Sequence, residues 1–220
     1  MSPDGFVPGY IVYLLEIFLP GIGFGELLNL WNSGETLAER IALAFALGLS
    51  IDTIVFLIKT SGAAGLVGIS LDSVYFVIGL GIAAIVASAI IKRKIAFPVR
   101  PVRTDVVLFV IMLLLGSMLL VYFQKYPIFP EYFTQDPTVH VGYVESLISG
   151  STTSIPSGLL YFGVHYQLAS GVLLVGGEPL VVVQRVMAIL VVISPLLFFH
   201  ASRKLFSSER AALIITIIYA

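Results

Sequence analysis

Long apolar runs recur along this chain, and they restrict its fold more than any other feature. An α-helix needs about 20 predominantly apolar residues to cross the hydrocarbon core of a bilayer. Six such runs cover residues 10–30, 41–58, 74–91, 106–123, 158–176 and 180–200. A seventh begins near Ala211 and stops at Ala220, where ten residues reach about half of that thickness. We therefore expect the chain to be the N-terminal part of a longer protein.

The charge content excludes several other classes of protein. Only 11% of the 220 residues are charged, against about 25% in soluble domains, so a water-soluble globule is excluded. Disorder requires low hydrophobicity and high net charge, whereas the net charge here is −1, which also gives no basis for binding nucleic acid. The absence of cysteine removes disulfides and thiolate metal sites. The sequence predicts an all-α, multi-pass transmembrane helix bundle whose partner is the lipid bilayer.

Basic residues predict the orientation of the bundle, because cytoplasmic connections carry an excess of Lys and Arg. They cluster in two connections, at residues 92–103 and 201–210. Both clusters lie on one side only if an even number of crossings separates them, yet residues 106–200 hold three apolar runs. If the run at 158–176 lies at the interface instead of crossing, nine of the 12 basic residues are cytoplasmic, against seven otherwise. We therefore expect a cell-membrane protein whose N-terminus and first external loop, about 124–179, are external.

The first of these basic connections also divides the chain. It contains Pro98 and Pro101 and separates an N-terminal three-helix unit, residues 1–95, from a second unit, residues 96–220.

Three acids lie within the apolar runs of the first unit: Glu16, Glu26 and Asp52. An ionisable side chain at membrane depth costs several kcal/mol unless it is paired or hydrated, so each is a candidate functional residue. Glu26 is expected to reach water near the cytoplasmic end of its helix. Glu16 and Asp52 have two interpretations, a hydrogen-bonded packing role within the bundle or a place along a transport pathway. Gly21 and Gly25 have the GxxxG spacing that permits close helix approach.

The external loop holds the most informative segment. Asp136 followed by Pro137 predicts a helix start, because Asp caps free N–H groups and proline fits the first turn. The helix is expected to run to Ser149 and to stop at Gly150. An apolar stripe is predicted to lie down on the membrane surface, and it consists of Val141, Val144 and Ile148.

Asp136 and His140 are four residues apart and project from the same side of this helix. The pair suits either a shared divalent cation, Mg or Mn, or a base with an orienting partner. The other interpretation is an N-cap beside an ordinary helix residue. Glu131 and Glu145 are further carboxylates within reach of the patch, or simply solvated charges.

The run at 158–176 is uncharged but contains aromatic and polar side chains, including His165, Tyr166 and Gln167, as expected of a helix at the membrane–water boundary. There His165 would contact a lipid phosphate or a sugar, or be satisfied by water or backbone. Arg185 stands at the external end of the next helix, where a guanidinium suits a phosphodiester or pyrophosphate, or anchors the helix among head groups.

Residues 105–220 resemble the start of the GT-C superfamily of polytopic glycosyltransferases, which use lipid-phosphate-linked sugar donors. The resemblance rests on the first-loop stretch Asp136-Pro137-Thr-Val-His140, similar to that of oligosaccharyltransferase catalytic subunits, and on the turn Gly176-Gly-Glu-Pro-Leu180. It also rests on Arg185 and on the connection from Ser202 to Leu213.

This resemblance implies a transferase that moves a sugar from a polyprenyl- or dolichyl-phosphate donor to an external acceptor. The first-loop acid of the family is catalytic and maps onto Asp136, with His140 in support and Arg185 at the donor phosphate. Many relatives have two adjacent acids in this loop, whereas Gln135 and Pro137 flank Asp136, so metal use stays open. Two alternatives to the enzyme remain, a transporter or lipid-handling protein and a scaffold subunit. The sequence does not indicate an oligomeric state.

Overall fold

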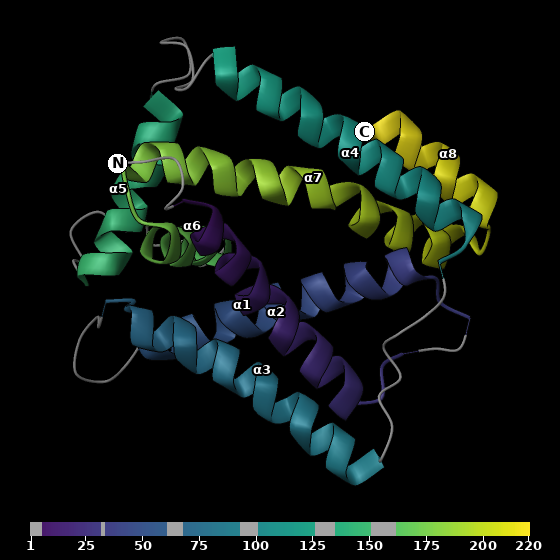
Figure 1. The fold of residues 1–220 in the computed structure, drawn as a ribbon, viewed down its shortest axis with the longest axis horizontal. Helices are drawn as coiled ribbons and strands as arrows, with labels where there is room; N and C mark the ends of the chain where they lie inside the picture. The colour runs from purple at the N-terminus through teal and green to yellow at the C-terminus, as the bar shows by residue number, and fades with distance from the viewer. Residues whose placement is uncertain (1–5, 32–33, 61–67, 93–100, 126–134, 151–161) are drawn as a thin grey trace.

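The computed structural model describes residues 6–31, 34–60, 68–92, 101–125, 135–150 and 162–220. All regular structure within these ranges is helical, which confirms the predicted fold class (Figure 1). The helices are α1 (Phe6–Leu27), α2 (Leu37–Thr60), α3 (Leu71–Lys92), α4 (Arg103–Lys125), α5 (Gln135–Ser149), α6 (Phe162–Val175), α7 (Pro179–Phe206) and α8 (Glu209–Tyr219).

Within the described residues, five helices are long and apolar enough to cross a membrane: α1, α2, α3, α4 and α7. The protein is therefore a multi-pass membrane protein. In the part of the chain that the structure describes, the apolar run at 158–176 contains α6, whose 14 residues extend about 21 Å along the helix axis, against a hydrocarbon core of roughly 30 Å.

One end of the bundle is built around α5 and α6, and we call it the α5 end (Figure 1). The end of α2 is tied to α6 there, because the hydroxyls of Thr60 and Tyr166 lie 2.8 Å apart. The start of α3 is tied to α5, since the Ile69 amide donates to the Leu147 carbonyl at 2.9 Å. These contacts place the candidate first-loop helix directly on the spanning helices.

The opposite end gathers the starts of α2, α4 and α8 and the end of α7, and we call it the basic end. Asp105 of α4 accepts from the Ala38 amide at 2.9 Å. Arg203 of α7 pairs with the buried Glu39 of α2. The start of α4 at Arg103 and the end of α7 at Phe206 both lie at this end (Figure 1), so the two spanning helices α4 and α7 return the described chain to the same end of the bundle. The side of the membrane that this end faces stays a prediction.

Helices α1 and α2 cross at unusually short range because two glycines face backbone. A Cβ added at Gly21 would lie 1.7 Å from the Ala44 carbonyl oxygen, and one added at Gly48 would lie 1.8 Å from that of Ile17. No larger residue fits either position without moving a helix. The GxxxG prediction is correct for Gly21 only. Gly25 faces no second helix, because the Trp31 ring occupies that space, 2.2 Å from an added Cβ.

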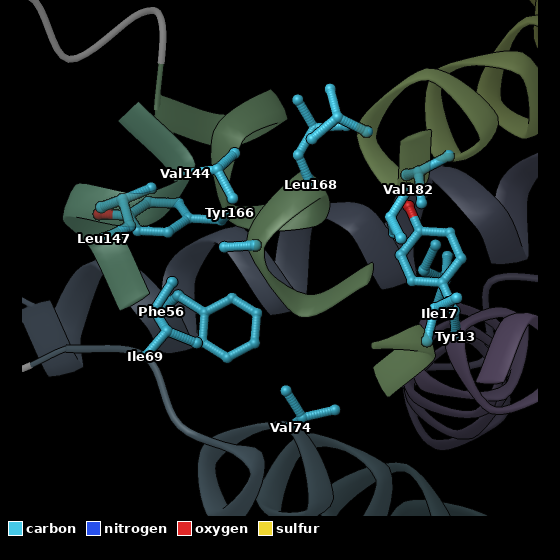
Figure 2. Packing of buried hydrophobic residues seen from close by; sticks show 14 of the residues in the cluster. Tyr13, Ile17, Phe56, Ile69, Val74, Val144, Leu147, Tyr166, Leu168 and Val182 are labelled. Carbon is cyan, nitrogen blue, oxygen red and sulfur yellow. The ribbon is translucent and has the colours of Figure 1, made fainter. Parts of the chain in front are cut away.

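Helix α6 lies in the middle of the core rather than at its margin. Figure 2 shows Tyr166 and Leu168 of α6 with α5 side chains on one side and Tyr13 and Ile17 of α1 on the other. All residues from 165 to 171 are buried. The side chains of this segment therefore pack against other helices, whereas the sequence predicted them at the membrane–water boundary; the depth of the segment in the membrane stays a prediction.

The apolar stripe of α5 also differs from expectation. Val144 is fully buried, and Val141 and Ile148 pack against the same core cluster. The stripe therefore faces the protein and not the membrane surface, because α6 and the start of α3 offer it an apolar surface to cover.

Candidate functional site

The candidate first-loop helix has nearly its predicted bounds. Helix α5 begins at Gln135, one residue before the predicted cap Asp136, and ends at Ser149. Gly150 follows with a φ of 72°, the left-handed conformation expected of a glycine that terminates a helix. Asp136 thus lies in the first turn, and its side chain is outside the described residues, as is the whole of Glu131.

His140 and His165 come together across α5 and α6. The Nδ1 of His140 lies 2.7 Å from the Nε2 of His165, and the two rings tilt by 31°. Tyr143, one turn after His140, presents its ring edge-on to both imidazoles. His165 is only 2% exposed, and its described partner is a second histidine, whereas the sequence predicted a lipid phosphate, a sugar, water or backbone.

The histidine contact has the geometry of a hydrogen bond. Two nitrogens that bind one tetrahedral metal at about 2.0–2.1 Å are separated by about 3.3 Å, more than the 2.7 Å found here. Among the described residues, no group of three or more His, Cys, Asp or Glu side chains could hold a metal ion. The divalent cation, Mg or Mn, therefore stays a prediction from the sequence. Glu145 is exposed, which fits its interpretation as a solvated charge.

The turn before α7 follows the motif that carries the family resemblance. Gly176 and Gly177 have φ values of 69° and 94°, a conformation that glycine adopts without steric cost. Glu178 then caps α7, since its carboxylate accepts from the Val181 amide at 2.9 Å, and Pro179 occupies the first turn. This turn fixes the start of α7 at the α5 end, and Arg185 follows in the second turn.

Arg185 lies at one end of an apolar groove. Its guanidinium interacts with the Tyr10 hydroxyl of α1, and both residues line a cavity of about 920 Å³ between α1, α2, α4 and α7. The lining runs along α7 from Arg185 to Leu196, about 16 Å of helix, and along α4 from Phe109 to Phe123, about 21 Å. Among the described lining residues, Arg185 alone carries charge.

The acids of the first unit are all buried, with exposed fractions of 0% for Glu16, 1% for Glu26 and 0% for Asp52. The prediction that Glu26 reaches water is wrong. A backbone turn closes the end of α1 next to this residue, where the Leu30 amide donates to the Gly25 carbonyl at 2.9 Å.

The sequence interpretation missed a polar cluster at the basic end. A cavity of about 270 Å³ is lined by Glu35, Glu39, Arg203 and Lys204, among others, and the Lys204 ammonium lies 3.5 Å from Glu35. The sequence feature that could have indicated this cluster is the i, i+4 spacing of Glu35 and Glu39 ahead of an apolar run. Opposite charges meet here directly, so the cluster has the form of a structural connection between α2 and α7.

Comparisons of the chain with protein-family models, with curated proteins and with solved structures find no match. The functional argument therefore rests on the residues and their geometry.

Proposed function

We propose that this chain is part of a GT-C-like membrane glycosyltransferase that moves a sugar from a polyprenyl- or dolichyl-phosphate donor to an acceptor on the external face. The observation that supports this most directly is the apolar groove with Arg185 at one end. An isoprenoid chain requires an apolar surface along its length, and its phosphate requires a cation at one end. A guanidinium binds phosphate oxygens in a bidentate manner.

The position of Arg185 also fixes the direction of such a donor. Arg185 is near the start of α7, at the same end of the bundle as α5 and α6. A donor whose phosphate binds Arg185 would extend its tail toward Leu196 and would present its sugar at the end that carries His140.

In the proposed reaction, Asp136 accepts the proton of the acceptor nucleophile as that atom bonds to the anomeric carbon. The bond from that carbon to the phosphate oxygen breaks, and the lipid phosphate leaves as an anion that Arg185 stabilises. His140 supports the base from the next turn of α5, and His165 fixes the His140 ring. Glu131 stays a substrate-binding candidate from the sequence alone. No step of this scheme depends on a metal ion.

The catalytic part of the proposal is tested by Asp136→Asn in the product of the whole gene. Asn has nearly the same size and shape as Asp, so insertion and abundance should not change. Loss of a general base lowers turnover by about 100-fold or more. Membranes are supplied with a polyprenyl phosphate that carries a radiolabelled sugar, and transfer is counted. Full transfer by the variant would overturn the assignment of Asp136.

The groove is tested separately by binding of a polyprenyl phosphate and of the matching polyprenol. Arg185→Gln should weaken binding of the phosphate about tenfold and leave the alcohol unaffected, whereas the exposed Arg210→Gln should change neither. Gly116→Leu should weaken both, because its side chain enters the groove, where an added Cβ meets only Val192, at 3.9 Å. Gly79→Leu, whose Cβ meets no atom within 4 Å, is the matched control. Unchanged binding in the groove variants would exclude the groove as the donor site.

A further inference from the structure

Glu16 and Asp52 meet inside the bundle because of the close α1–α2 crossing. Gly21 of α1 lies beside Ala44 of α2. Ile17, four residues earlier in α1, lies beside Gly48, four residues later in α2. The next step sets Tyr13 opposite Asp52, and Tyr13 interacts electrostatically with both acids. Asp52 lies eight residues before the end of α2. It is therefore about 12 Å along the helix axis from the α5 end of the bundle.

Neither carboxylate has a countercharge among the described residues. Both Oε atoms of Glu16 and the Oδ1 of Asp52 are buried and accept no hydrogen bond. The Oδ2 of Asp52 receives one long bond, 3.4 Å, from the Nε2 of Gln167 on α6. Two buried carboxylates in one pocket are costly unless positive charge neutralises them. The arrangement therefore requires bound protons or metal cations, because the described side chains supply no positive charge here.

Further oxygens face the same place without partners. The Tyr13 hydroxyl and the Gln167 Oε1 make no hydrogen bond, although the two residues are only 0% and 3% exposed. The Ser170 hydroxyl lies beside Glu16 while it donates to the Gln167 carbonyl. Three helices, α1, α2 and α6, thus carry buried oxygen atoms near the two acids.

We propose that Glu16, Asp52, Gln167 and Tyr13 form a binding site for a hard, oxygen-preferring metal cation, Na⁺ or Ca²⁺, which enters in exchange for protons. The donor set consists entirely of oxygen atoms, and hard cations prefer such ligands. Electroneutrality allows Ca²⁺ with two carboxylates, or Na⁺ with one carboxylate and one retained proton. Mg²⁺ fits less well, because it keeps several water ligands and these side chains are almost wholly buried.

This site gives the protein a function beyond glycosyl transfer. A cation bound at this depth would join α1, α2 and α6 through a single group, and intramembrane acids of this kind mark ion pathways. The site does not depend on Asp136, Arg185 or the groove, so it stands or fails independently of the proposed enzyme.

The first experiment measures thermal unfolding of the detergent-purified protein in choline chloride, with NaCl, KCl or CaCl₂ added at matched ionic strength. The specific cation should raise Tm by roughly 5 °C at a concentration 100 times its Kd. Glu16→Gln and Asp52→Asn should each abolish this rise. Asp72→Asn, which removes an exposed acid from the first turn of α3, should retain it. The cation that produces the rise, Na⁺ or Ca²⁺, identifies the ligand.

A second measurement uses the wild-type protein alone and does not depend on the folding of a variant. Addition of the cation to weakly buffered protein should release protons, detected with a pH-sensitive dye, because the metal replaces protons on the two acids. A Tm that no cation shifts, with no proton release, would show that the pair holds protons only and would overturn the proposal. An equal rise in the wild type and in both acid variants would place cation binding elsewhere and would overturn it as well.

Discussion

The Nδ1 of His140, on α5, lies 2.7 Å from the Nε2 of His165, on α6. One ring donates this hydrogen bond and the other accepts it, so the tautomer of one imidazole sets that of its partner. Because His165 is buried and His140 is in the helix of the proposed catalytic loop, the bond connects the reaction site to the bundle core. His165 is therefore a positioning residue, although its sequence context indicated a boundary residue that contacts substrate.

Replacement of His165 by Phe keeps a ring of similar size and removes the hydrogen bond to His140. We expect a loss of about 1–2 kcal/mol in the free energy of unfolding, the usual cost of removing one partner from a hydrogen bond whose other partner is at least half-buried. Amide hydrogen exchange should accelerate across α5 and remain unchanged across α1 and α2. Val164→Ala, at the exposed neighbouring position, should cost less than about 0.5 kcal/mol. Unchanged exchange in α5 would show that the histidine pair does not hold this helix.

Gly48→Ala tests the close crossing of α1 and α2. The added Cβ would lie 1.8 Å from the Ile17 carbonyl oxygen, so the helices must separate, at a cost of about 1–3 kcal/mol or more. Gly79→Ala on α3, where no atom lies within 4 Å of the added Cβ, should be neutral or stabilising. The measurement is the midpoint of unfolding in a denaturing detergent. Equal midpoints for the two variants would contradict the crossing.

The spanning helices and the end of α5 were predictable because local chemistry determines them. The apolar length of each run is a property of a continuous segment, and the φ of 72° at Gly150 follows from the glycine itself. The burial of α6 was not predictable in this way. Water can satisfy the polar ends of Tyr166 and Gln167 as well as their partners in the structure, Thr60 and Asp52, do. The sequence does not show which of these partners is present.

The two side-chain pairs of the candidate sites depend on long-range register. Glu16 reaches Asp52 only because Gly21 and Gly48 both face backbone at one crossing, and a single glycine spacing within α1 does not reveal that. His140 reaches His165 through the packing of α5 on α6, across 25 residues of chain. The sequence identified each of these side chains as a candidate, because two are acids within apolar runs, one is spaced four residues from Asp136 and one is a polar residue in an uncharged run. The choice of partner belongs to the tertiary structure.

Tyr166 should make the stability of the protein depend on alkaline pH. Burial raises the pKa of its phenol above the ordinary value of 10.0. Thr60 donates to the Phe56 carbonyl at 2.8 Å, so Tyr166 is the donor toward Thr60 and needs its proton. The folded state therefore holds this proton more tightly than the unfolded state does. The resulting stability is complete below pH 10.0 and is lost as the pH rises through the raised pKa.

Tyr166→Phe should accordingly flatten the fall in unfolding free energy between about pH 9 and 11, measured by chemical denaturation at a series of pH values. Tyr75→Phe, at a position that is 55% exposed, should leave that slope as in the wild type. The comparison of the two variants matters because the chain has 10 tyrosines, whose combined titration would otherwise hide one phenol. If Tyr166→Phe and Tyr75→Phe give the same slope, the Tyr166 hydrogen bond does not contribute to stability at the α5 end, and α6 is held there by its apolar contacts and by His165.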